Sequence, residues 1–95
     1  MITHTVLFRL KPGADAHGFA AGLRAFAAAP PHALGPGAVT ESLGLRPGPR
    51  MAHAMMVLQF PDVDAFKAYV EHALHLELLK DYLEPSCEGW WSVQA

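Results

Sequence analysis

The stretch Ala52-His-Ala-Met-Met-Val-Leu-Gln-Phe60 is hydrophobic at nearly every position, whichever way alternate residues are grouped. Alternate residues of a β-strand face opposite sides of a sheet, so this pattern is typical of a strand that is covered on both sides. We therefore predict that residues 52–60 form a central strand. Helices can cover one side of it, and the other side needs a second layer.

The three segments before this strand show the hydrophobic periods of a strand, a helix and a second strand. Residues 3–10 alternate with the period of a strand. Residues 15–29 carry Phe19, Leu23 and Phe26 at helical spacing and end at Pro30-Pro31. Residues 39–45 alternate again, which predicts a weaker second strand.

The segments after it predict helices and one further strand. Asp62 is a good N-cap for a helix. Tyr69 is expected beside the buried stripe of that helix, which consists of Val63, Phe66, Val70 and Ala73. A shorter helical segment over residues 75–83 is expected to present Leu76, Leu79 and Leu83 on one side, and residues 89–94 form a last strand. There Trp90 and Trp91 should point to opposite faces.

This order of elements predicts an α+β fold of the ferredoxin-like β-α-β-β-α-β plan, with helices on one face of a four-stranded antiparallel sheet. We expect the 95 residues to form a single domain, 1–95. Hydrophobic residues make up 52% of the chain and charged residues 17%, more hydrophobic surface than so small a domain can bury alone. We therefore expect a homodimer, packed sheet to sheet as a barrel shared by two chains.

Charge and composition argue against several classes of partner. The net charge is −2, and the seven Lys and Arg residues are scattered, so nucleic acid is not expected as a partner. No hydrophobic run approaches the length needed to cross a membrane. The single cysteine, Cys87, cannot form an internal disulfide, which favours a cytoplasmic location.

Polar chemistry is concentrated in Phe66-Lys-Ala-Tyr-Val-Glu-His-Ala-Leu-His75, around the end of the second helix. His4 and His53 begin neighbouring antiparallel strands, so they should lie at opposite ends, about 20 Å apart. If the helix runs back along the third strand, it brings His75 toward His53. The pattern thus predicts a cluster of Tyr69, His75 and His53.

An imidazole and a phenol suit proton abstraction next to a carbonyl group, chemistry that needs no metal or cofactor. A hydrophobic pocket would have to exclude water around them. Its walls are expected to come from Val6, Phe8, Phe19, Leu23, Met55 and Val57.

Structural roles for the same residues remain open. Tyr69 could be a core tyrosine whose hydroxyl bonds to the backbone, and His75 a helix cap or a buried imidazole. A metal site is a further alternative, with His72 and His75 as ligands and Glu71 or His53 as the third.

The opening Ile2-Thr-His-Thr-Val-Leu-Phe-Arg-Leu-Lys11, the strand end Leu58-Gln-Phe60 and above all the segment 66–75 resemble the stress-responsive α/β-barrel (Dabb) domain family. The resemblance covers essentially the whole chain and implies a dimeric ferredoxin-like barrel. One departure is Ala73, where members often carry a proline after the first histidine of the segment. An alanine there could let the helix run on and turn His75 differently.

Most members of that family have no assigned activity, but plant polyketide cyclases with this fold use a tyrosine and a histidine in the cavity between sheet and helices. The resemblance thus implies Tyr69 as the carbonyl or enolate anchor, His75 as the general base, and His4 and His53 as further pocket histidines. Three functions stay open: a cofactor-independent cyclase or lyase acting on a small carbonyl-containing molecule, a binding module for such a ligand, and a non-catalytic dimeric protein.

Overall fold

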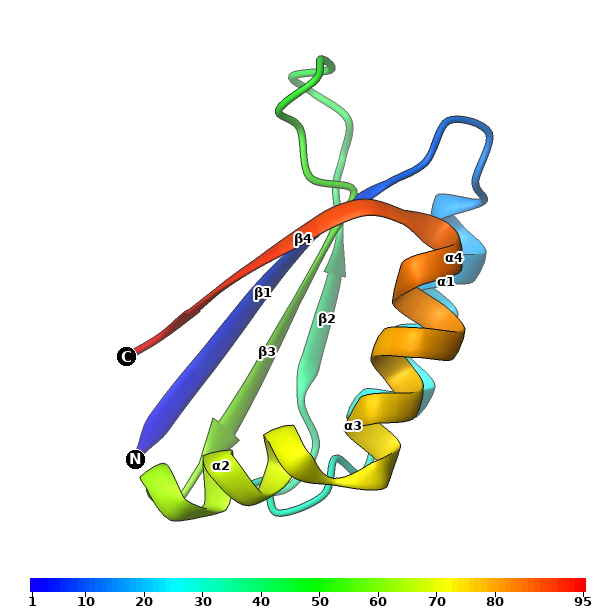
Figure 1. Ribbon diagram of the computed structural model, residues 1–95. Coiled ribbons are helices and arrows are strands. Elements are labelled where there is room, and N and C mark those ends of the chain that lie inside the picture. The colour runs from blue at the N-terminus through cyan, green and yellow to red at the C-terminus, as the bar shows by residue number, and fades with distance from the viewer.

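The computed structural model, which describes residues 1–95, has a four-stranded antiparallel sheet with all its helices on one face (Figure 1). This confirms the predicted fold. The strands lie in the order β2-β3-β1-β4, so that β3 and β1 are interior. Their bounds are Ile2–Leu10 for β1, Ala38–Glu41 for β2, Ala54–Phe60 for β3 and Cys87–Gln94 for β4.

The register of the sheet decides which side chains meet the helices. Val6 pairs with Met56 and Phe8 with Ala54, and all four are buried beneath the helices. Leu7, which pairs with Met55, lies on the opposite face. β3 is therefore hydrophobic on both faces, as its sequence predicts.

β2 is shorter than predicted because the alternating pattern continues into a loop. Leu43 and Leu45 are exposed, and Gly44 between them has a positive φ of 69°, a backbone conformation that a strand does not use. The loop over residues 42–53 projects beyond the sheet (Figure 1).

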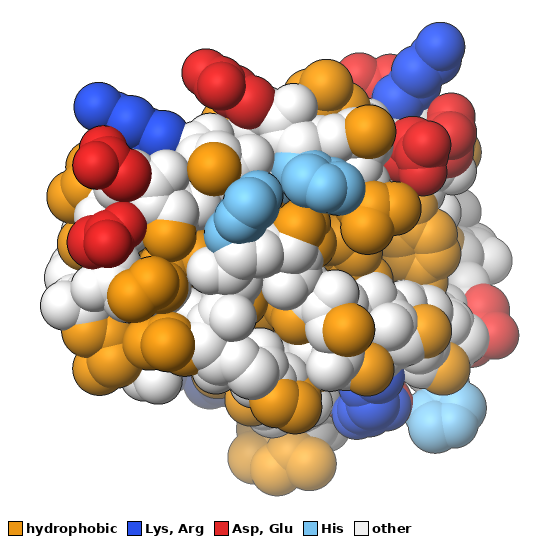
Figure 2. All heavy atoms as spheres, turned by 90° about the horizontal axis from the view of Figure 1, so that it is seen from below, with side chains coloured by type: hydrophobic (Ala, Val, Ile, Leu, Met, Phe, Trp, Pro, Cys, Tyr) orange, Lys and Arg blue, Asp and Glu red, His pale blue; other side chains and the backbone are white.

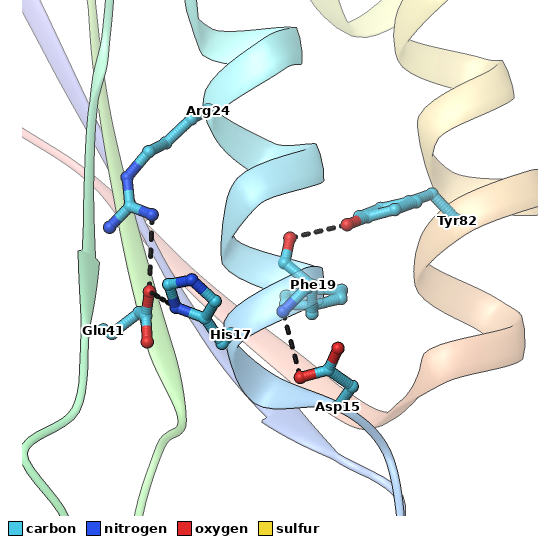
Figure 3. Close-up of polar contacts among 7 residues, drawn as sticks. Asp15, His17, Phe19, Arg24, Glu41 and Tyr82 are labelled. Carbon is cyan, nitrogen blue, oxygen red and sulfur yellow. Dashed lines mark hydrogen bonds and ion pairs between the residues drawn. The ribbon is translucent and has the colours of Figure 1, made fainter.

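The helix α1 (Ala16–Ala27) buries Phe19, Ala20, Leu23 and Ala27 against the sheet. Polar contacts also connect α1 to neighbouring elements (Figure 3). Glu41 of β2 accepts from Arg24 at 3.3 Å and lies 2.9 Å from the His17 Nδ1 atom. The hydroxyl of Tyr82 donates to the carbonyl of Phe19 at 2.5 Å.

The second helical region is broken at His72. The helix α2 (Val63–Glu71) lies across the end of the sheet where β3 finishes (Figure 1). His72 is extended, with ψ 143°, and the chain then turns back along the sheet. It does so through α3 (Ala73–Glu77), the π-helical segment η1 (Leu78–Leu83) and the single turn α4 (Glu84–Ser86).

The two predicted stripes hold only in part: Phe66, Leu79 and Leu83 pack in or against the core, and the other members are exposed. Across the end of the sheet, α2 fully buries only Tyr69, while Val63 and Val70 are exposed. In η1, whose backbone has the i→i+5 bonding of a π-helix, the buried leucines are Leu78 and Leu83. Leu76 is exposed.

The face of the sheet away from the helices is open. Trp91 is 59% exposed on this open face, and Leu7 and Val93 are exposed beside it. Trp90 packs against the core on the other face, which confirms the opposite directions predicted for the two tryptophans. None of the helices combines the length and hydrophobicity required to span a lipid bilayer.

Candidate functional site

A pocket of about 340 Å³ lies between the sheet and the helical region from α2 to η1. Its polar lining comes from His4, Tyr69, His75, Ser92 and Gln94. The hydrophobic lining consists of Val6, Phe8, Met56, Phe66, Val70, Leu78, Leu79, Leu83 and Trp90. No Asp, Glu, Lys or Arg side chain lines it.

Tyr69, in the last turn of α2, places its hydroxyl at this pocket. The residue is only 1% exposed, and its ring centroid lies 4.7 Å from that of His75 and 6.0 Å from that of His4. Burial raises the pKa of Tyr69 well above its usual range. The hydroxyl makes no hydrogen bond within the protein and is not sealed away from the pocket. It is therefore a protonated donor that a ligand can use.

His75, in α3, presents a base to the same pocket. Its Nδ1 atom lies 2.9 Å from the carbonyl oxygen of Val70. A carbonyl oxygen only accepts, so the neutral ring carries its proton on Nδ1 and has a free lone pair on Nε2. Burial lowers the pKa of His75, and the hydrogen bond to Val70 acts in the opposite direction.

His4, near the start of β1, is the second histidine in the pocket. The residue is 7% exposed. Burial, with His75 as a second cause, lowers the pKa of His4 to about 4. Its Nδ1 atom lies 2.8 Å from the side-chain nitrogen of Gln94. His4 is thus neutral at physiological pH.

The structure does not bring His53 to this pocket, so the predicted cluster of Tyr69, His75 and His53 is corrected. His53 lies before β3, and its Nδ1 atom accepts from the backbone N–H of Leu10, at the other end of β1 from His4. The prediction assumed that the second helix runs back along β3. Because α2 instead crosses the end of the sheet, Tyr69 and His75 stay beside His4.

Four expected wall residues also lie elsewhere. Phe19 and Leu23 are buried in the core beneath α1 and do not line the pocket. Met55 and Val57 belong to the open face, and Met56 takes the place expected for Met55 because adjacent residues of a strand point to opposite faces. Val6 and Phe8 line the pocket as expected.

His72 does not line the pocket. Its Nδ1 atom accepts from the backbone N–H of Leu74 at 3.1 Å and caps α3, and its ring packs against that of His32. Figure 2 shows two histidine side chains next to each other among hydrophobic atoms on the surface seen from below.

No group of three His, Cys, Asp or Glu side chains is arranged to hold a metal ion.

Sequence reasoning missed Ser92 and Gln94. Both lie on β4, on the same face as Trp90, which packs in the core. Two polar residues on the core-facing side of a predicted strand were the available signal. They needed the pairing of β4 with β1, which places Gln94 opposite His4.

A model of the stress-responsive A/B barrel domain family matches residues 2–94. The chain belongs to this family. No curated protein matches it.

Solved structures from several organisms share the fold over nearly the whole chain. A Dabb family protein with a ferredoxin-like fold from Mesorhizobium loti is 20% identical, with a TM-score of 0.76, and 99% of this chain and 93% of that one are covered. A dimeric ferredoxin-like protein of unknown function from Thermobifida fusca is 25% identical, with a TM-score of 0.76 and coverage of 99% and 88%. A protein from Arabidopsis thaliana is 13% identical, with a TM-score of 0.79 and coverage of 100% and 93%.

Proposed function

We propose that the pocket binds a small uncharged carbonyl compound and catalyses proton transfer at the carbon next to the carbonyl, as a cyclase or lyase does. The observation that carries this proposal is the pairing of Tyr69 and His75, a donor and a base, in a pocket otherwise lined mainly by hydrophobic side chains. The Tyr69 hydroxyl has no protein partner and is open to the pocket, so it is available to donate to a ligand.

The lining also selects the charge of the ligand. With no lysine or arginine in the pocket, a protonated histidine is the only positive charge that the lining could offer a bound carboxylate or phosphate. Burial lowers the pKa of both His4 and His75, so neither supplies that charge at neutral pH. The volume of about 340 Å³ lies at the small end of the range for ligand pockets. A small neutral molecule fits these limits.

The reaction follows from which atoms are free. The ligand's carbonyl oxygen accepts a hydrogen bond from the Tyr69 hydroxyl, and the Nε2 atom of His75 takes a proton from the neighbouring carbon. The electron pair of the broken C–H bond moves onto the oxygen, and Tyr69 stabilises the resulting enolate. Val70 accepts from the opposite edge of the His75 ring and supports the positive charge that forms on it.

We propose in addition that two copies pack sheet to sheet through the open face. Leu7, Trp91 and Val93 are exposed there in one chain, and relatives such as the Thermobifida fusca protein are described as dimeric. Burying this surface removes hydrophobic area from water at about 25 cal/mol per Å². The pocket lies on the other side of the sheet and would remain accessible.

Exchange of the methyl hydrogens of acetophenone in D2O, followed by NMR, tests the proposed chemistry. We expect the wild-type protein to bind acetophenone and accelerate exchange, His75→Ala to reduce the rate to that of buffer, and Tyr69→Phe to slow it by about 10²-fold or more. Benzoate, of similar size but charged, should not bind. His17→Ala, on the surface of α1, is a matched control that should exchange at the wild-type rate.

The other outcomes point to the other functions. Binding of acetophenone without exchange would contradict catalysis on simple ketones and support the small-molecule binding module. Absence of both, across ketones that fit the volume, would contradict the proposal and support a non-catalytic dimeric protein.

A further inference from the structure

We infer that Gln94 is a positioning residue that holds His4 in the tautomer with its proton on Nε2. The three rings with polar groups in the pocket then differ in role: the Tyr69 hydroxyl and the His4 Nε2–H group donate, and the Nε2 atom of His75 accepts. The use of this arrangement rests on the proposed function, whereas the arrangement itself does not.

The hydrogen bonds of Gln94 carry the inference. Its side-chain nitrogen lies 2.8 Å from His4 Nδ1 and 3.2 Å from the hydroxyl oxygen of Ser92. An amide nitrogen has two hydrogens and only donates, so both of these atoms accept. A neutral imidazole that accepts at Nδ1 carries its proton on Nε2. The Ser92 hydroxyl, which can both donate and accept, here accepts the second hydrogen of the amide nitrogen.

The sheet register builds this contact. Gln94 of β4 is paired directly with His4 of β1, and Ser92 is two residues away on the same face of β4. Both hydrogen bonds between Thr3 and Ala95 close the adjacent end of the ladder. The three side chains are thus held by backbone pairing, independently of the helices.

No neighbouring group favours the other tautomer. The titratable side chains that face His4 are Tyr69 from α2 and His75 from α3. Neither is a carboxylate, which would require a donor at Nδ1. His75 has the opposite arrangement, because the Val70 carbonyl takes its Nδ1 proton. The Nε2 atoms of the two histidines therefore have opposite roles: that of His4 donates and that of His75 accepts.

Two-bond ¹H–¹⁵N correlation NMR on the ¹⁵N-labelled protein at pH 8 distinguishes the tautomers directly. We expect His4 in the Nε2–H form and His75 in the Nδ1–H form. His17 is an internal reference, because its Nδ1 atom faces the Glu41 carboxylate at 2.9 Å and must carry a proton.

Gln94→Glu is the informative variant, since a carboxylate only accepts. It should switch His4 to the Nδ1–H form and raise its pKa, while His75 and His17 keep their patterns. Gln94→Leu removes the contact without adding a charge and should leave His4 as a mixture of tautomers. It also covers the case in which Gln94→Glu fails to fold.

The inference is overturned if wild-type His4 carries its proton on Nδ1, or if neither variant changes the His4 pattern. These spectra need no ligand, so they can fail or succeed independently of the acetophenone assay. If the tautomers are as inferred but exchange is absent, only the proposed function falls. If both hold, Gln94→Glu should lower the exchange rate at least about tenfold with a fold that NMR shows to be intact.

Discussion

The partners of each polar side chain in the pocket determine which of its atoms a ligand can reach. The Val70 carbonyl occupies one edge of His75 and Gln94 one edge of His4, while the Tyr69 hydroxyl has no partner in the protein. Tyr82 differs, because its hydroxyl donates a hydrogen bond to the carbonyl oxygen of Phe19. The Tyr82 hydroxyl thus links η1 to α1, whereas the Tyr69 hydroxyl is left open to the pocket.

His4 should make the stability of the protein depend on pH. Its pKa is lowered from 6.5 to about 4, so the unfolded chain binds more protons than the folded one between these values. Unfolding free energy is therefore highest above pH 6.5 and falls as the pH drops toward 4, by up to about 3 kcal/mol from this group. Burial lowers the pKa of His75, which adds to the same trend.

Urea unfolding of wild type and His4→Gln between pH 4 and pH 7 measures this contribution. The variant should lose less stability than wild type over that interval, because it lacks His4 and because His75 no longer has the charge of His4 beside it. Equal slopes for the two proteins would show that His4 is protonated as easily in the folded state as in the unfolded one.

The residues of the pocket could be predicted only in part from sequence. Tyr69 and His75 could be singled out because their spacing puts both near one helix end. The choice of His53 over His4 depended on the direction of that helix, which hydrophobic periodicity does not contain. Gln94 depends on a contact across 90 positions of sequence, set by the pairing of the first and last strands.

At the scale of elements, the break at His72 is what forms the site. His72 is extended and its side chain caps the next helix, so α2 and α3 meet at an angle that places Tyr69 and His75 on the same pocket. The resemblance to the family raised the concern that Ala73, in place of proline, would let the helix continue. The structure shows that the helix stops there with alanine.

Ala73→Pro should be tolerated. Ala73 is the first residue of α3, a position where proline is favoured, and the extended His72 already has the conformation that precedes proline. We expect a gain of about 0.4 to 1 kcal/mol through the unfolded state. Ala68→Pro, in the interior of α2, is the matched control and should cost about 3 kcal/mol or more.

Chemical denaturation of both proline variants gives this comparison. A loss of stability in Ala73→Pro similar to that in Ala68→Pro would contradict the assignment of His72 as the helix boundary.

The helical segments also show where periodicity is an incomplete guide. Residues 75–83 were predicted as helical from regularly spaced leucines, and they are helical. The buried pair Leu78 and Leu83 lies in the wider turn of η1, which the spacing of hydrophobic residues alone does not distinguish from an α-helix.

For the whole molecule, the two faces of the sheet have different roles. The helices cover one face and leave the pocket between them, while the open face exposes Trp91 and its neighbours. The strand order and the layer arrangement could be predicted because β3 is hydrophobic on both sides and the order of elements admits few topologies. The exposure of Leu43 and Leu45 could not, since a loop that begins with alternating residues resembles a strand.

Trp91→Glu should separate the proposed dimer. A carboxylate on the open face, at the position of Trp91 in the edge strand β4, would have to be buried without a partner, which costs several kcal/mol. Val63→Glu is the control, because Val63 is 51% exposed on α2, away from the open face. Sedimentation velocity at one protein concentration should give a monomer for Trp91→Glu and a dimer for Val63→Glu and wild type. A monomeric wild type, or a dimeric Trp91→Glu, would rule out sheet-to-sheet packing.

The claim that the Tyr69 hydroxyl serves a ligand rather than the fold is tested most directly by urea unfolding of Tyr69→Phe beside Tyr82→Phe at one fixed protein concentration. Concentration must be fixed because a dimer gains stability from it. We predict that Tyr69→Phe is neutral or stabilising, whereas Tyr82→Phe, which loses the bond to Phe19, costs about 0.5 to 1.5 kcal/mol. A cost for Tyr69→Phe as large as that for Tyr82→Phe would show that its hydroxyl is a structural hydrogen-bond partner and would contradict the account.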